Sequence, residues 1–133
     1  MNKDAVSTLN SLIETCKDGE KGFKEAAEGL KSADIKAKFL EYSRERAQMA
    51  AQLQTEVRSL GGDPDKGGSM SGSVHRGWLN LKAAMTGQDD HAIVSEAERG
   101  EDVAKEAYES ALKATLPASA QTLVQQQAAK VRR

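Results

Sequence analysis

Apolar residues recur along much of this chain in alternating steps of three and four, which is the spacing of one face of an α-helix. The first such stripe reads Val6, Leu9, Ile13, Cys16, Glu20, Phe23, Ala27 and Leu30. The second reads Ile35, Phe39, Tyr42, Arg46, Met49, Leu53 and Leu60, and a later one Val94, Ala97, Glu101, Ala104, Tyr108 and Ala111. Stripes of this length predict long amphipathic helices around a shared core. Each stripe is interrupted once by a charge, and buried charges are rarely left unpaired.

Capping and breaking residues divide the chain into long helices. We predict one domain over residues 1–133, with helices at about 3–31, 34–60, 73–86, 89–115 and 117–133. Ser32 or Asp34 caps the second helix, and Gly61 supplies the left-handed residue that ends it. Asp89 or Asp90 caps the helix that follows the long connection.

Composition narrows the class of protein. The chain has 133 residues, only 4% of them aromatic, and a net charge of −1, which favours a helical domain and argues against nucleic-acid binding. Cys16 is the only cysteine, so it cannot form an intramolecular disulfide, and its stripe position predicts a small buried side chain. No uncharged run is long enough to cross a membrane, and the first residues lack the apolar core of a signal peptide. We therefore expect a cytoplasmic protein without membrane contacts.

The helix pattern predicts an all-α four-helix bundle. The connection over residues 61–88 is long enough to travel back along the bundle, with its own short helix. That permits a ferritin-type crossover, in which the second and third long helices run parallel. The three interrupting charges, Glu20, Arg46 and Glu101, then fall at one height, each about three turns from the same end.

We predict that Glu20, Arg46, Glu98 and Glu101 form a buried polar layer. In one interpretation Arg46 neutralises the carboxylates and fixes the helix register. In the other, Glu20, Glu45, Glu98 and Glu101 hold iron or manganese. Small-ligand binding is a third possibility.

Other polar residues of the stripes also bear on this layer. The hydroxyls of Tyr42 and Tyr108 are placed to satisfy nearby carboxylates. Gly19, Gly22 and Gly100 lie in helix interiors at the same level, where glycine costs about 1 kcal/mol relative to alanine. Close helix approach, a π-bulge or a ligand would account for them.

Three short motifs carry a resemblance to a known family. They are Asp18-Gly19-Glu20-Lys21-Gly22-Phe23, His75-Arg76-Gly77-Trp78 and Glu98-Arg99-Gly100-Glu101-Asp102. Together they resemble a bacterial family of ferritin-like four-helix bundles that has no established function. The resemblance covers essentially the whole chain and implies the crossover bundle, but no activity.

The sequence departs from the di-iron pattern of ferritin-like proteins, in which two helices each contribute Glu-x-x-His. The nearest match on the second helix is Glu45-x-x-Gln48, and the last helix offers neither Glu nor His. Arg46 would place a permanent cation where the metal belongs. We therefore predict no metal or cofactor.

We predict that His75, Arg76 and Trp78 anchor the crossover helix to the bundle, with Trp78 filling core space. A ligand or a proton relay at His75 is the alternative. No catalytic residues emerge from the pattern. The first hypothesis is a non-enzymatic, stress-associated or structural bundle that acts through protein contacts, as a homo-oligomer or with a protein partner. The second is a ferritin-like metal-binding protein or oxidase.

Overall fold

The computed structural model describes residues 2–64, 78, 81, 85 and 89–132, which fold into α-helices without a strand. The helices are α1 (Asn2–Gly29), α2 (Ala33–Ser59), α5 (Asp90–Lys113) and α6 (Ala118–Arg132). Each bound lies within two residues of the sequence prediction, so the all-α class and these four helices are confirmed. Most of the helix predicted over residues 73–86 lies outside the described residues and stays a prediction.

Two side-chain caps explain where α2 and α5 begin. Ser32 is the N-cap of α2 and accepts a hydrogen bond from the backbone N–H of Ile35 at 3.4 Å. Asp89 caps α5 and accepts from the backbone N–H of His91 at 3.0 Å. Each cap satisfies a backbone donor that the first helical turn leaves without a partner.

The end of α2 is set by glycine. Gly61 has a φ of 82°, a left-handed conformation that glycine adopts without steric cost. The N–H of Gly61 donates to the carbonyl of Arg58, and the N–H of Gly62 donates to the carbonyl of Val57. This pair of bonds is the Schellman motif, which stops the helix.

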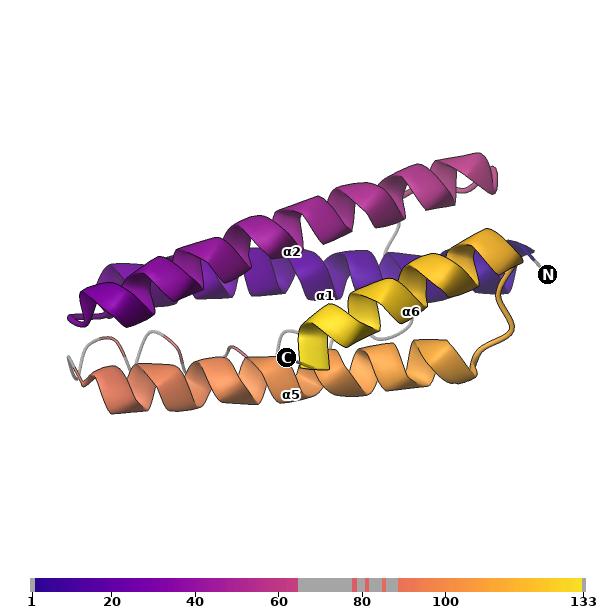
Figure 1. Ribbon diagram of the computed structural model, residues 1–133. Coiled ribbons are helices and arrows are strands. Elements are labelled where there is room, and N and C mark those ends of the chain that lie inside the picture. The colour runs from indigo at the N-terminus through magenta and orange to yellow at the C-terminus, as the bar shows by residue number, and fades with distance from the viewer. Residues whose placement is uncertain (1, 65–77, 79–80, 82–84, 86–88, 133) are drawn as a thin grey trace.

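The ends of α1, α2 and α5 meet at one end of the bundle. The carboxylate of Asp90 accepts hydrogen bonds from the backbone N–H groups of Lys31 at 2.8 Å and Ser32 at 2.9 Å. These bonds lower the pKa of Asp90 below its ordinary value. In Figure 1, α1 is antiparallel to α2 and to α5, so that α2 and α5 run in the same direction.

The interior contains two hydrophobic clusters. The first cluster is formed by Leu9, Leu12, Ile13, Cys16, Met49, Ala50, Leu53, Val57, Ala104, Ala107, Tyr108, Ala111, Ala120, Val124, Ala128 and Val131. The second cluster is formed by Phe23, Ala26, Ala27, Leu30, Phe39, Leu81, Ile93 and Ala97. Arg46 and Glu101 lie between the two in sequence on α2 and α5, so the polar layer divides the core.

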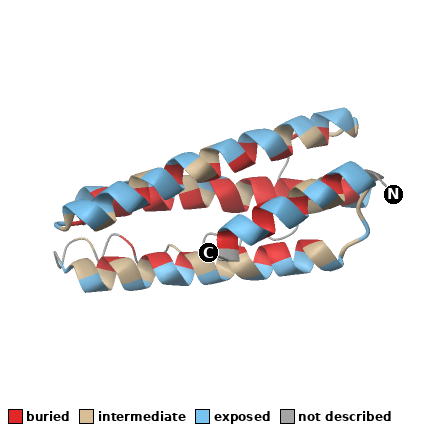
Figure 2. Cartoon of the chain, viewed as in Figure 1, coloured by how far each residue is buried: buried red, intermediate tan, exposed pale blue. Residues whose placement is uncertain are grey.

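The fourth helix covers only one of these clusters. With 15 residues, α6 is much shorter than α1, α2 and α5, and it ends near the middle of α5 (Figure 1). Its buried residues Ala120, Val124 and Val131 join the first cluster. Figure 2 shows buried and exposed stretches alternating along α6. None of the helices in the described part of the chain has both the length and the apolar composition needed to span a bilayer.

Candidate functional site

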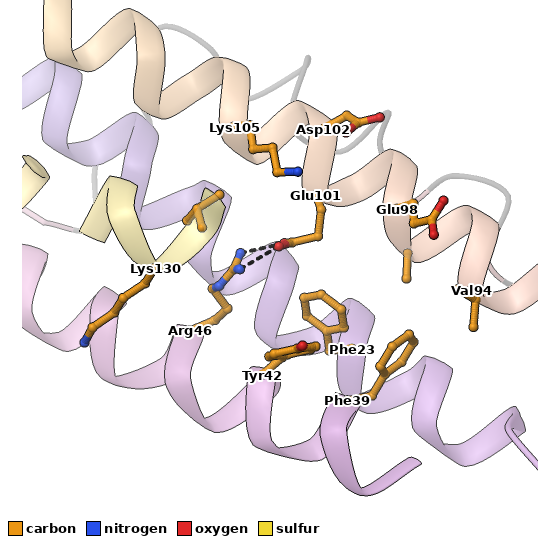
Figure 3. A pocket seen from close by; sticks show the side chains of 12 residues that line it. Phe23, Phe39, Tyr42, Arg46, Val94, Glu98, Glu101, Asp102, Lys105 and Lys130 are labelled. Atoms are coloured by element: carbon orange, nitrogen blue, oxygen red, sulfur yellow. Dashed lines mark hydrogen bonds and ion pairs between the residues drawn. The ribbon is translucent and has the colours of Figure 1, made fainter. Parts of the chain in front are cut away.

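Arg46 of α2 and Glu101 of α5 form a two-pronged ion pair in the middle of the bundle. The two guanidinium Nη atoms each donate to one carboxylate oxygen of Glu101, and both distances are 2.7 Å. Figure 3 shows the two side chains pointing toward each other across the space between α2 and α5. Arg46 is 2% exposed, whereas the Glu101 side chain is 22% exposed. The pair is therefore buried at its cationic end and reaches water only at its anionic end.

Residues of α1 make room for the Arg46 side chain and contact its charge. A Cβ atom on Gly19 would lie 3.3 Å from Cγ of Arg46, so the glycine leaves space for the arginine stem. The guanidinium carbon lies 5.7 Å from the centre of the Phe23 ring, a cation–π distance. Burial opposes the charge, but hydrogen bonding to Glu101 and its charge raise the pKa of Arg46 above its ordinary value.

The carboxylates predicted to join this layer differ in their positions. Glu20 is half-buried and contributes its backbone carbonyl, which accepts a 2.8 Å hydrogen bond from the Ser43 hydroxyl. Within the described residues its carboxylate forms no salt bridge with Arg46. Glu98 is exposed, so its inclusion in a buried layer was wrong. It lies one turn before Glu101 on α5, at the rim rather than in the interior.

A metal centre does not fit the four glutamates that were considered for one. Both oxygens of Glu101 are engaged by Arg46, and Glu98 is exposed. Across residues 2–64, 78, 81, 85 and 89–132, no three His, Cys, Asp or Glu side chains gather as a metal would require. A metal bound here would have to displace a buried guanidinium from its only anion among the described residues.

A second polar cluster lies one to two turns away, inside the first hydrophobic cluster. The hydroxyl of Tyr108 lies 3.2 Å from the thiol of Cys16 and donates to Oε1 of Gln127 at 2.8 Å. Nε2 of Gln127 donates to the carbonyl of Met49 at 3.1 Å and to Oε1 of Gln52 at 3.0 Å. The prediction that the Tyr108 hydroxyl serves a carboxylate was therefore wrong. The one sequence signal for this cluster was the position of Gln127 between Val124 and Val131 on the inner face of α6.

The groups of this second cluster are held in their neutral forms. Burial raises the pKa of the Cys16 thiol to about 11. Burial and the neighbouring Cys16 raise the pKa of Tyr108 well above its ordinary value. General acid–base catalysis works best with a pKa near the working pH, and a reactive cysteine needs a thiolate. These groups therefore suit a structural role.

Trp78 explains two of the three glycines in the helix interiors. A Cβ atom on Gly22 of α1 would lie 2.5 Å from the Trp78 ring, and one on Gly100 of α5 would overlap with it. The ring also meets Phe23 edge-on, with centroids 5.2 Å apart. The indole thus wedges between α1 and α5, partly buried and packed against the second hydrophobic cluster. His75 and Arg76, the other predicted anchors, lie outside the described residues.

An open groove lies beside the ion pair, between α2 and α5 and beyond the last turn of α6. Its volume is about 500 Å³. The lining residues are Phe23, Phe39, Tyr42, Arg46, Val94, Ala97, Glu98, Glu101, Asp102, Lys105, Lys130 and Val131. Figure 3 shows the rings of Phe23, Phe39 and Tyr42 close together below Glu101. In the described part of the chain, Tyr42 is the one large apolar side chain left exposed, at 36%.

Comparison with models of known protein families identifies the family of this chain. A model of a domain of unknown function, DUF2383, matches residues 4–114, which is most of the sequence. The chain belongs to the DUF2383 family. None of the curated proteins is similar enough to this chain to count as a match.

The DUF2383 match includes some parts of the site and not others. It covers α1, α2 and α5, and with them Gly19, Arg46, Trp78 and Glu101. It ends at residue 114, before α6, so Gln127 and the α6 end of the groove lie beyond the matched segment. The ion pair and the tryptophan wedge thus belong to the part of the chain that defines the family membership.

Proposed function

We propose that this DUF2383 protein is a non-enzymatic bundle of ferritin-like topology that binds an amphipathic helix of a partner protein in the groove between α2 and α5. The observation that carries the proposal is the half-covered face of the bundle. On one half, α6 packs against α5 and α2, whereas the other half presents a groove of about 500 Å³. The parallel directions of α2 and α5 in Figure 1 support the topology.

The shape and chemistry of the groove suit a helix. Along α5 it extends from Val94 to Lys105, which corresponds to about 16 Å or three helical turns. Its floor is apolar, formed by residues such as Phe23, Phe39 and Val94. Helix-in-groove recognition uses apolar anchors at helical spacing in such a floor.

The groove also lies in line with the surface on which α6 packs. Val131, in the last turn of α6, is part of both the first hydrophobic cluster and the groove wall. A helix bound in line with α6 would complete a fourth helix along the whole bundle. The Arg46–Glu101 pair then lies at the junction of the two helices.

Reactive chemistry has little support at this site. Arg46 is already paired, and its raised pKa keeps it charged. The thiol of Cys16, with a pKa of about 11, stays protonated at neutral pH. A binding role makes use of the groove without requiring any of these groups to react.

A neutral stapled helix tests the proposal. The probe is a 12-residue peptide with leucines at helical spacing on one face and glutamines elsewhere, titrated by calorimetry into the full chain. We expect saturable binding that is abolished by Val94→Glu, which places a charge in the apolar floor. Ser95→Glu is the matched control, because Ser95 is the next residue on α5, exposed and outside the groove.

Two results would speak against the proposal. One is the absence of binding to the folded protein, and the other is binding that Val94→Glu and Ser95→Glu weaken equally. Light scattering over a concentration series tests whether a second copy of the chain occupies the groove. Self-association lost in Val94→Glu alone would keep the groove as the docking site and identify the partner as the chain itself.

A further inference from the structure

The walls of the groove carry charges of predominantly one sign beyond the end of α6. On α5, Glu98 and Asp102 line the groove and are exposed. On α2, Glu41 and Glu45 line a smaller pocket that shares Tyr42 with the groove. Lys38 lines the same smaller pocket, so four carboxylates and one lysine border this stretch. Lys105, one turn after Asp102 on α5, and Lys130 line the groove where α6 stops.

The ion pair does not change this balance. Arg46 and Glu101 neutralise each other, and their two hydrogen bonds use both Nη atoms and both carboxylate oxygens. Within the described residues, Glu41, Glu98 and Asp102 form no salt bridge. Their charges are therefore available to a group that enters the groove.

The helix already packed on this face is α6, and its composition complements the carboxylates that line the groove. From Ala118 to Arg132, α6 contains no Asp or Glu, and it ends with Lys130 and Arg132. Its buried residues Ala120, Val124 and Val131 follow helical spacing. In its first turn the hydroxyl of Ser119 donates to the carboxylate of Glu56 on α2 at 2.8 Å. The packing of α6 thus combines buried apolar residues with a hydrogen bond to one carboxylate of α2.

We infer that the occupant of the groove is a basic amphipathic helix, with apolar anchors at the spacing seen in α6 and Lys or Arg on both flanks. The inference rests on the proposed function, since it specifies the partner of the same groove. The apolar anchors provide burial, while the flanking cations meet Glu98 and Asp102 on one side and Glu41 and Glu45 on the other. Complementary charge of this kind gives specificity and faster association more than raw affinity.

Three stapled 12-residue helices test whether the groove prefers a basic or an acidic partner. They share the same apolar anchors, and their flanks carry lysine, glutamine or glutamate. We expect affinities for the full chain in the order lysine, glutamine, glutamate. The lysine and glutamate peptides should differ by about tenfold or more at low salt, and the difference should shrink as salt is added.

Charge reversal in the protein shows which carboxylates produce the preference for the lysine peptide. The double variant Glu98→Lys/Asp102→Lys should weaken the lysine peptide and strengthen the glutamate peptide. The matched control is Glu106→Lys/Glu109→Lys, which makes the same change in net charge at exposed positions of α5 outside the groove. It should leave the order of affinities unchanged.

The outcomes separate the two claims. Equal affinity for the three peptides, or equal effects of the two double variants, would overturn the basic partner and leave the helix-binding groove intact. A preference for the glutamate peptide would also overturn it. Failure of all three peptides to bind would overturn the groove itself, and the inference with it.

Discussion

The two hydrophobic clusters on either side of the Arg46–Glu101 pair are closed in different ways. The first cluster is covered by α6 and contains neutral hydrogen-bonding groups, Cys16, Tyr108 and Gln127. The second cluster lies beyond the end of α6 and includes Leu81, with Trp78 and Met85 packed against it. It is closed by Trp78 between α1 and α5 and is bordered by the open groove between α2 and α5. One half of the bundle is thus built as a closed core, and the other borders an open groove.

The boundary between the halves shows why a charge is tolerated there. Arg46 is buried, but Glu101 reaches the groove and therefore water. A pair with one solvated end loses less hydration than a fully buried pair. The polar groups inside the closed half are instead neutral, as in the hydrogen bond from Tyr108 to Gln127.

The largest expected effect tests this boundary. Removing the carboxylate by Glu101→Ala leaves the buried guanidinium without an anion, which should lower the free energy of unfolding by roughly 3–5 kcal/mol. Removing the cation by Arg46→Met leaves Glu101, which can turn toward water, and should cost about half as much or less. Urea denaturation of both variants measures the difference. Equal losses would show that the two ends of the pair are buried alike.

The next prediction concerns the closed half. A thiol whose pKa is raised by folding stabilises the protein fully below its ordinary pKa of 9.0, and that contribution is lost as the pH rises to about 11. The shift corresponds to about 3 kcal/mol. We expect the unfolding free energy to fall less steeply between pH 9 and 11 in Cys16→Ala than in the parent, as measured by urea denaturation under reducing conditions.

Cys16→Ser serves as the control for this experiment. Serine keeps a hydroxyl toward Tyr108 but does not ionise in this range, so its alkaline slope should match that of Cys16→Ala. A slope equal to that of the parent would assign the pH dependence to other groups, with Tyr108 the first to test.

The smallest expected effect is that of Gly100→Ala, and its sign depends on whether Trp78 is present. Gly100→Ala places a Cβ atom against the Trp78 ring and should destabilise the protein by about 1–3 kcal/mol. In a Trp78→Ala background the clash is gone, and the same substitution should stabilise α5 by about 1 kcal/mol, because alanine favours helix over glycine. Thermal unfolding of the double-mutant cycle reports the coupling. Additive effects would mean that the ring does not lie on Gly100.

Much of the fold and part of the site followed from the sequence. Spacing in steps of three and four located α1, α2, α5 and α6, because burial of one helix face leaves a periodic signal. The same spacing marked Arg46 and Glu101 as inward-facing. It also predicted Glu20, although Gly19 is the residue of α1 that faces the arginine stem. Adjacent helix positions differ by about 100° in direction, so the stripe alone could not decide between them.

Contacts between distant helices were harder to predict. The pairing of Tyr108 with Gln127 depends on where α6 lies against α5, and no local pattern carries that information. The glycines illustrate the same limit. Their cost in a helix indicated that something approaches closely, but the approaching group is Trp78, which comes from a different part of the chain.

The position of Trp78 also gives the molecule an intrinsic optical reporter. It is the only tryptophan in the chain, and its ring lies between Gly22 and Gly100 in contact with Phe23. Its emission therefore reports whether Trp78 stays docked between α1 and α5, while circular dichroism reports the helices themselves. The two signals would separate if the Trp78 ring detached before the helices unfolded, so one residue would reveal two stages in the loss of structure.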